Sequence, residues 1–178
     1  KHEYNVALVS SMIAHHGMAD AKTWLEGVKA NLARKPQGND RDQVKAIKDG
    51  ICDVSLGNSY YLGAMLKDQA QKSWADAVYI NFPNQGDRGA HVNVSGVAMT
   101  KYAKNKDAAQ KLMEFLSGDT AQHMYADVNA EYPVKAGVEP SAMVKSWGSF
   151  KSDPMPVSDY AKHRKDALQL LDEVKFDL

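Results

Sequence analysis

The sequence has one cysteine, no excess of either charge and no long apolar run. Cys52 has no second cysteine with which to form an internal disulfide, and one thiol cannot supply a thiolate cluster for zinc or iron–sulfur. The 22 basic residues equal the 22 acidic ones, which argues against a nucleic-acid binder, because such domains carry a basic excess or patch. No stretch reaches the roughly 18 apolar residues of a membrane span. These absences leave a globular chain of 178 residues, long enough for a real core.

Signatures of catalysis are also missing. No Ser-His-Asp order, nucleophile elbow or carboxylate pair stands out, and "GDRG" at 86–89 has glycines without the strand and helix of a nucleotide site. His15 and His16 precede Gly17 at an expected helix end, where adjacent histidines diverge, so a solvated helix end is a simpler interpretation than a metal site. We therefore expect a protein that is not an enzyme.

Hydrophobic spacing predicts an alternation of helices and strands. Apolar residues recur at helical spacing in six stretches: 5–16, 20–33, 40–49, 59–77, 105–129 and 159–176. Gly17 is expected to end the first of these helices. Small, apolar or alternating residues predict three strands: 52–58, 78–83 and 91–100. The order predicts an α/β fold with helices flanking a mainly parallel sheet. Ligands of such sheets bind where a strand ends and the next helix begins, and "VSLGNSYY" is such a junction.

The adjacent Tyr60 and Tyr61 are the most unusual feature of that junction. If Asn58 or Ser59 caps the following helix, both tyrosines fall in its first turn, only about 100° apart round the axis. Two phenol oxygens can then converge on one point, and hard oxygen donors suit a hard cation, since tyrosinate is a ligand of ferric iron. The alternative is that both rings simply cover the helix start with their hydroxyls in water.

Longer stretches of the chain resemble a known family. The block "NLARKPQGNDRDQVKAIKDGICDVSLGNSYYLG", followed by "HVNVSGVAMTKYAKNKDAAQKLMEFLSGDTAQ" and "NAEYPV", is similar to the ferric-iron-binding periplasmic proteins of bacterial ABC importers. The resemblance covers nearly all of the chain. It implies a type II periplasmic binding protein that closes two lobes on Fe3+.

The resemblance also implies a ligand set. The tandem tyrosines of the family match Tyr60 and Tyr61, and "EYN" near the start matches a third tyrosine, Tyr4. Asn58 resembles an asparagine of the motif that orients a ligand or contacts an accompanying anion. Arg41 is expected either to offset phenolate charge or to be a surface residue. The implied cargo is ferric iron, alone or with carbonate or another synergistic anion, and the implied setting is the periplasm, beside an inner-membrane ABC permease.

The resemblance further implies an incomplete bilobal protein, mostly the C-terminal lobe. We expect residues 1–90 and 142–178 to form that lobe, and residues 91–141 to cross to the missing N-terminal lobe, which supplies other ligands in the family. An open ligand set of three tyrosines is expected to bind more weakly than a closed one.

Two other functions remain open from the sequence. The same fold could serve a type II receptor for an organic anion or other small solute, with the tyrosines stacking on it or hydrogen-bonding to it. A metal-dependent enzyme would need a base beside the metal, and no such base is evident.

Overall fold

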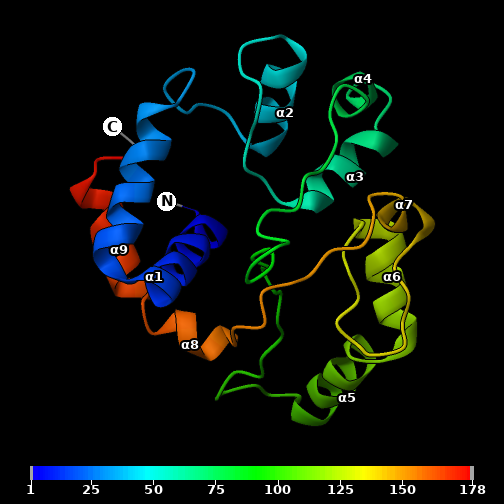
Figure 1. Cartoon of the computed structure of the whole chain (residues 1–178). Helices are drawn as coiled ribbons and strands as arrows, with labels where there is room; N and C mark the ends of the chain where they lie inside the picture. Colours follow the sequence, from blue (N-terminus) through cyan, green and yellow to red (C-terminus); the bar gives the residue numbers. More distant parts are fainter. Residues whose placement is uncertain (1, 177–178) are drawn as a thin grey trace. The chain divides into compact units, whose positions relative to one another are not determined.

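A computed structural model describes residues 2–176 of the chain (Figure 1). Within this range the ordered elements are helices, and they are α1 (Glu3–Ala30), α2 (Asp40–Lys48), α3 (Ser59–Lys67), α4 (Lys72–Ala75), α5 (Lys106–Leu116), α6 (Asp119–Asn129), α7 (Ala142–Lys145), α8 (Val157–Ala161) and α9 (Arg164–Glu173). The helices expected from hydrophobic spacing are all present, although 59–77, 105–129 and 159–176 are each divided between two helices. None of the described helices combines the length and the apolar character needed to cross a bilayer.

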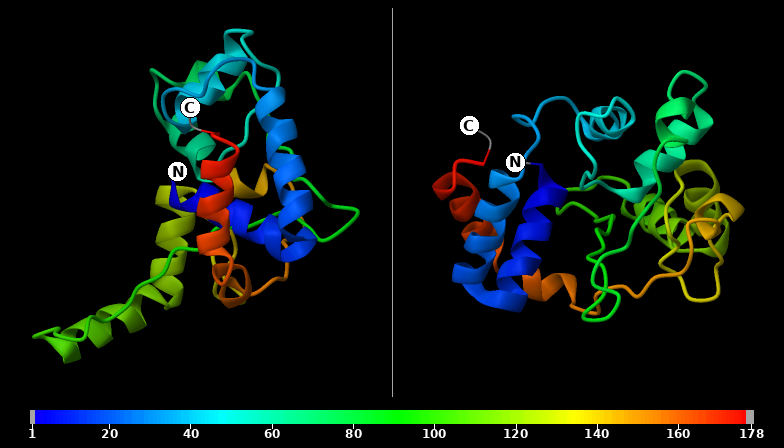
Figure 2. Two further views of the ribbon diagram at one scale, coloured as in Figure 1. Left: turned by 90° about the vertical axis from the view of Figure 1, so that its left-hand side faces the viewer. Right: turned by 45° about the horizontal axis from the view of Figure 1, so that its top comes forward.

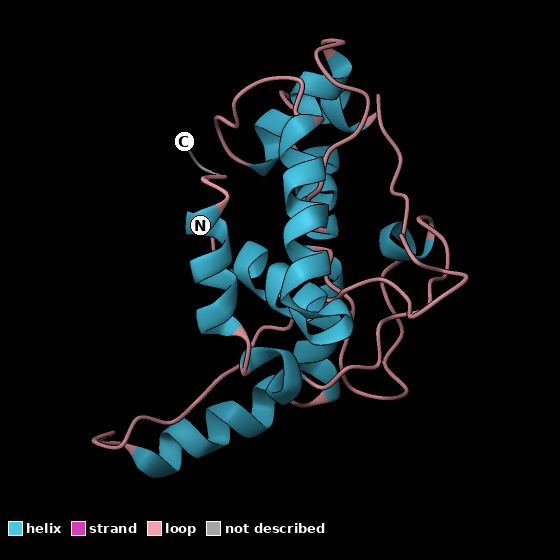
Figure 3. Ribbon diagram, turned by 60° about the vertical axis from the view of Figure 1, so that its left-hand side comes forward, coloured by secondary structure: helices cyan, strands magenta, loops and turns pink. Residues whose placement is uncertain are grey.

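The parallel sheet expected from the sequence is not confirmed. Residues 2–176 contain one isolated parallel bridge, between Ala90 and Ser152, and otherwise helices and loops (Figure 3). An alternating stretch becomes a strand only when another strand satisfies its backbone groups. The expected strands have no such partner in the described residues, and several of their apolar side chains face solvent: Val54 is 77% exposed, Leu56 62% and Tyr79 87%.

The chain divides into two compact units. Within the described residues, the first unit contains the chain up to Gln37, Phe82–Val94 and everything from Phe150 onward, and the second contains Gly38–Asn81 and Ser95–Ser149. Each unit is therefore built from segments that are far apart in the sequence.

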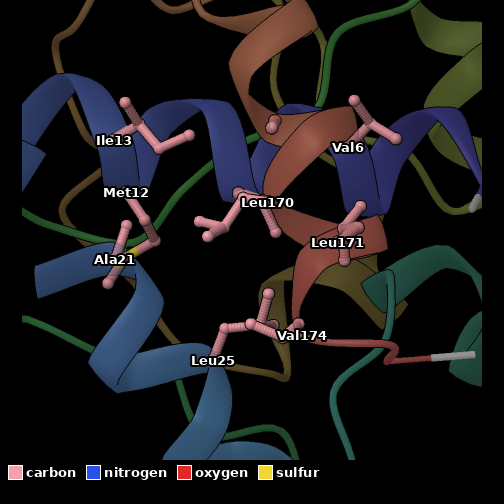
Figure 4. Close-up of a cluster of buried hydrophobic side chains, with 10 residues drawn as sticks. Val6, Met12, Ile13, Ala21, Leu25, Leu170, Leu171 and Val174 are labelled. Carbon is pink, nitrogen blue, oxygen red and sulfur yellow. The ribbon is translucent and has the colours of Figure 1, made fainter. Parts of the chain in front are cut away.

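The first unit is organised round a kink in α1. Gly17 has φ 80° and ψ 171°, a backbone conformation essentially confined to glycine, and it divides α1 into two helical limbs (Figure 2). The helix end predicted at Gly17 is thus confirmed. Side chains of both limbs and of α9 point toward one another in a buried cluster (Figure 4), which includes Val6, Met12, Ile13, Ala21, Leu25, Leu170, Leu171 and Val174. The kink allows one sequence segment to cover two sides of α9.

The second unit is packed mainly round α3. Leu62, Met65 and Ala75 are buried, and partly buried side chains of α2, α3, α4 and later segments pack against them: Val44, Leu66, Trp74, Val78, Ile80 and Trp147. Helix α6 also contacts α3. This packing buries one side of α3 and leaves its first turn half-buried.

Candidate functional site

The first turn of α3 carries the tyrosine pair. Asn58 is the N-cap residue, with an extended backbone (φ −82°, ψ 137°), and its side chain makes no capping hydrogen bond. Its carbonyl accepts the first helical bond, from the Tyr61 amide at 3.2 Å. Tyr60 and Tyr61 therefore both lie in the first turn, as the sequence predicted.

The two phenol rings lie side by side. Their centroids are 4.5 Å apart and their planes are tilted by 37°, and both side chains are half-buried. The two phenols also share a side-chain hydrogen bond. Adjacent residues thus present their hydroxyls together at the helix start rather than on opposite faces.

The surroundings of Tyr60 favour its neutral form. Burial is the main cause that raises the pKa of the Tyr60 phenol above 10.0, and the hydrogen bond with Tyr61 adds to it. The nearby carboxylates of Asp40 and Glu131 raise this pKa further. A cation that replaced the phenol proton would instead be attracted by both carboxylates.

The sequence predicts Asp40 only as a helix cap and indicates no site role for Asp40 or Glu131, and the N-cap of α2 is in fact Asn39. Asp40 opens α2, where Asn39 and Asp42 form the capping box. A Cβ atom added at Gly57 would lie 3.9 Å from Asp40 Oδ1, so this carboxylate reaches the segment that leads into α3. Glu131, the glutamate of "NAEYPV", is distant from Tyr60 in the chain. Local sequence patterns could not reveal that packing brings them together.

Arg41 lies in the same unit as the tyrosine pair. It is half-buried in the first turn of α2, and its Nη1 donates to the side-chain oxygen of Gln71 at 3.5 Å, the upper limit for a hydrogen bond. The charged side chains of other elements that shift the Tyr60 pKa are the carboxylates of Asp40 and Glu131, and Arg41 is not among them. A role of Arg41 in offsetting phenolate charge stays a prediction.

Tyr4 belongs to the first unit. It lies in the first turn of α1, is half-buried, and stacks on the ring of His2 with centroids 4.0 Å apart. Its place in one site with Tyr60 and Tyr61 stays a prediction.

The donors of the second unit suit a hard cation. Among the described residues, no group of three or more histidine, cysteine, aspartate or glutamate side chains could hold a metal ion. A metal at the start of α3 would therefore depend on phenol oxygens, and two of them lie together there with two carboxylates nearby. Oxygen donors with negative charge are the ligands that hard, highly charged cations prefer.

A second polar cluster lies in the first unit. His15 Nε2 donates to Asp153 Oδ2 at 2.6 Å, and the Met155 amide donates to Asp153 Oδ1 at 3.0 Å. Burial alone would raise the pKa of Asp153, but the Met155 amide, the His15 ring and the Arg88 guanidinium together hold it below 3.8. The expectation that His15 sits at a solvated helix end is wrong, because its side chain is only 21% exposed and is bonded to a buried carboxylate.

A small cavity adjoins this cluster. It has a volume of about 190 Å³, and Asp153, His91, Tyr160 and aliphatic side chains line it. His91 meets the Tyr160 ring edge-on at 5.5 Å between centroids. Burial is the main cause that lowers the pKa of His91. A neutral histidine in a mostly apolar lining indicates packing between the segments rather than a charged binding site.

Comparison with known families identifies the class of protein. Residues 8–152 match the family described as bacterial extracellular solute-binding protein. The chain belongs to this family.

Individual relatives are iron proteins. The chain is 42% identical over 175 residues to iron uptake protein A2 of Synechocystis sp., covering 96% of this chain and 51% of that protein. It is 32% identical over 130 residues to the major ferric iron-binding protein of Neisseria meningitidis, covering 73% of this chain and 38% of that protein. The resemblance to ferric-iron-binding proteins is confirmed, and the chain spans about half the length of the Synechocystis protein.

Solved structures with the same fold carry similar descriptions. The apo ferric ion-binding protein A of Pasteurella haemolytica is 61% identical with a TM-score of 0.96, over 100% of this chain and 56% of that one. The IdiA (FutA) protein of Trichodesmium, solved with iron and citrate ligands, is 44% identical with a TM-score of 0.92. The match covers 97% of this chain and 55% of that one. These structural relatives are type II periplasmic binding proteins, whereas the parallel sheet expected from the sequence is not confirmed in residues 2–176 of this chain.

Proposed function

We propose that this chain is part of the solute-binding component of an iron(III) ABC importer and that Fe3+ is its cargo. The single observation that carries the proposal is the pairing of the Tyr60 and Tyr61 rings, 4.5 Å apart, at the start of α3. The names of the relatives, which are ferric iron-binding and iron uptake proteins, support the same cargo.

In this proposal the phenol oxygens of Tyr60, Tyr61 and Tyr4 bind the ion as phenolates. Phenolates are hard anionic donors and ferric iron is a hard cation, so donor and ion suit each other. Each phenol gives up its proton when it binds, because a bound metal ion dominates the local pKa values. Asn58 and Arg41 support the site, and carbonate or another anion completes the ligand set.

Residues 1–90 and 142–178 would form one lobe, and residues 91–141 would cross to the other. The family of extracellular solute-binding proteins fits a periplasmic location and delivery of the cargo to an inner-membrane permease.

A competition titration tests the cargo. The 178-residue chain is titrated with Fe3+ against citrate, beside a Tyr60→Phe/Tyr61→Phe variant and a Tyr102→Phe control, whose ring is 83% exposed. We expect one tight site in the wild type and in the control, and an affinity lower by about a hundredfold or more in the double variant, since two charged donors are lost. Equal affinity in all three proteins would contradict the proposal. Citrate bound tightly without iron would favour a receptor for organic anions.

A further inference from the structure

The end of helix α6 packs on the face of α3 that carries Tyr60. Tyr60 and Gly63 are three residues apart in α3, so they lie on the same face of the helix. A Cβ atom added at Gly63 would lie only 2.2 Å from the Cβ of Ala130, which directly follows α6. The residue after Ala130 is Glu131, and the packing of its neighbour therefore brings it to the Tyr60 side of α3.

The backbone that carries Glu131 is fixed by several contacts. Ala130 is fully buried and adopts the left-handed conformation (φ 57°, ψ 36°), which turns the chain sharply at the end of α6. The Glu131 amide donates to the carbonyl of Tyr125 at 3.3 Å. From α3, Lys67 Nζ donates to the carbonyls of Asp127 and Val128, the second at 3.0 Å. A cation at a helix C-terminus is favourable, so this contact also stabilises the docking of α6 on α3.

Two carboxylates from different elements lie at the Tyr60 end of α3. Glu131 is half-buried and directly follows Ala130, which packs on the Tyr60 face of α3. Asp40 approaches from α2, and its Oδ1 would lie 3.9 Å from a Cβ atom at Gly57. Negative charge from two different elements makes this end of α3 attractive to cations and unfavourable for an anion that binds without a cation. This matters because a helix N-terminus by itself favours anions.

We propose that Glu131 is a positioning and specificity residue of the tyrosine site, which holds the Tyr60 side of α3 negative so that the site accepts a highly charged cation rather than an organic anion. This inference rests on the proposed function. Glu131 acts by the electrostatic potential that its carboxylate creates at the phenols. The atoms that bind the metal are the phenol oxygens.

Charge can be separated from shape at this position. Glu131→Gln keeps the size and an acceptor oxygen but removes the charge, and Glu131→Asp keeps the charge on a shorter side chain. Glu114→Gln is the matched control, because Glu114 is exposed on α5 and contacts Gln110 on the same helix. The affinity of each 178-residue chain for Fe3+ is measured against citrate, together with the intensity of the phenolate-to-iron absorption at saturation and the thermal unfolding temperature.

We expect Glu131→Gln to lower the Fe3+ affinity by about tenfold or more, because one nearby unit charge is lost at short range from a trivalent ion. The absorption at saturation should stay at the wild-type intensity, since both phenols are present, and the unfolding temperature should not change. Glu131→Asp should bind within about threefold of the wild type, as should Glu114→Gln.

Two results would overturn the role of Glu131. One is a Glu131→Gln variant that binds Fe3+ like the wild type. The other is an equal loss of affinity in Glu131→Gln and Glu131→Asp, accompanied by a lower unfolding temperature, which would indicate a purely structural role. If the wild-type chain shows no phenolate-to-iron absorption, the proposed function is contradicted. The proposed role of Glu131 is then contradicted as well, because it depends on that function.

Discussion

Gly63 of α3 and Ala130, the residue after α6, pack so closely that the position of Gly63 has no room for a side chain. A Cβ atom there would lie 2.2 Å from the Cβ of Ala130, and 3.3 Å from the ring of Trp147. The absence of a side chain at Gly63 thus allows α6 to end against the helix that begins with the tyrosine pair. The arrangement of the candidate site depends on this contact between two small residues.

Gly63→Ala should destabilise the second unit. An extra methyl group in a packed interior costs about 1–3 kcal/mol, which exceeds the gain of up to about 1 kcal/mol from replacing a helical glycine by alanine. Urea unfolding followed by circular dichroism measures the difference. Gly27→Ala in α1 is the control, because a Cβ atom at Gly27 would contact nothing within 4 Å. Equal stability of the Gly63→Ala variant and the wild type would contradict the packing described here.

Gly17→Ala tests the kink of α1. A Cβ atom at Gly17 would meet nothing within 4 Å, so any cost comes from the backbone conformation, φ 80° and ψ 171°, which alanine rarely adopts. We expect a loss of about 1–3 kcal/mol in the free energy of unfolding of the first unit. Gly86→Ala serves as the comparison, since its position is open and its φ is not in the left-handed range. A neutral Gly17→Ala variant would mean that α1 does not need this kink.

Asp153→Asn should destabilise the first unit in a pH-dependent way. The pKa of Asp153 is lowered in the folded chain, so its charged form contributes stability above the ordinary value of 3.8, and this contribution is lost as the pH falls through the lowered pKa. We expect a cost of about 1–3 kcal/mol at pH 7, because the His15 ring and the Met155 amide lose a charged acceptor. The cost should shrink as the pH falls below 3.8.

Urea unfolding of the wild type and Asp153→Asn across that pH range measures this effect. Asp87→Asn is a suitable control, because Asp87 is 74% exposed and lies 3.6 Å from Arg88 in a surface pair. Its removal should change stability by no more than about 0.5 kcal/mol. A cost for Asp153→Asn that is the same at pH 7 and pH 3 would argue against a lowered pKa.

Iron binding should release protons from the tyrosine pair. The pKa of Tyr60 lies above 10.0, so its phenol is neutral at pH 7 and must lose a proton to bind as phenolate. The affinity for Fe3+ should therefore rise with pH. Proton release on addition of ferric citrate, corrected with a protein-free blank, should be one proton per ion smaller in Tyr60→Phe than in Tyr102→Phe. Identical release by both variants would show that Tyr60 does not bind as phenolate.

The sequence predicted the helices better than the sheet, for a physical reason. A helix satisfies its backbone bonds internally, so the apolar spacing round Gly17 and in α9 was enough to place these elements. A strand depends on a partner, and the alternation of residues 91–100 contains no information about whether one is present. Without a partner strand, apolar residues of this stretch stay exposed: Val94 is 55% exposed and Val97 48%.

The candidate site was predictable only in part. Tyr60 and Tyr61 are neighbours in the sequence, so a helix start at Asn58 was enough to place them together. Glu131 reaches them through the close contact of Gly63 with Ala130, and nothing in a local pattern marks that contact. Ala130 is the clearest example, since its left-handed conformation at the end of α6 is one that sequence would have assigned to glycine or asparagine.

The central claim is that Tyr60 and Tyr61 bind Fe3+ as phenolates, and resonance Raman spectroscopy of the iron-loaded chain, excited in its visible absorption, tests it most directly. The account predicts ring vibrations of metal-bound phenolate in the wild type and in Tyr102→Phe, weaker ones in each of Tyr60→Phe and Tyr61→Phe, and a further loss in the double variant. Iron bound by the wild type without phenolate vibrations, or vibrations of undiminished intensity in the double variant, would contradict it.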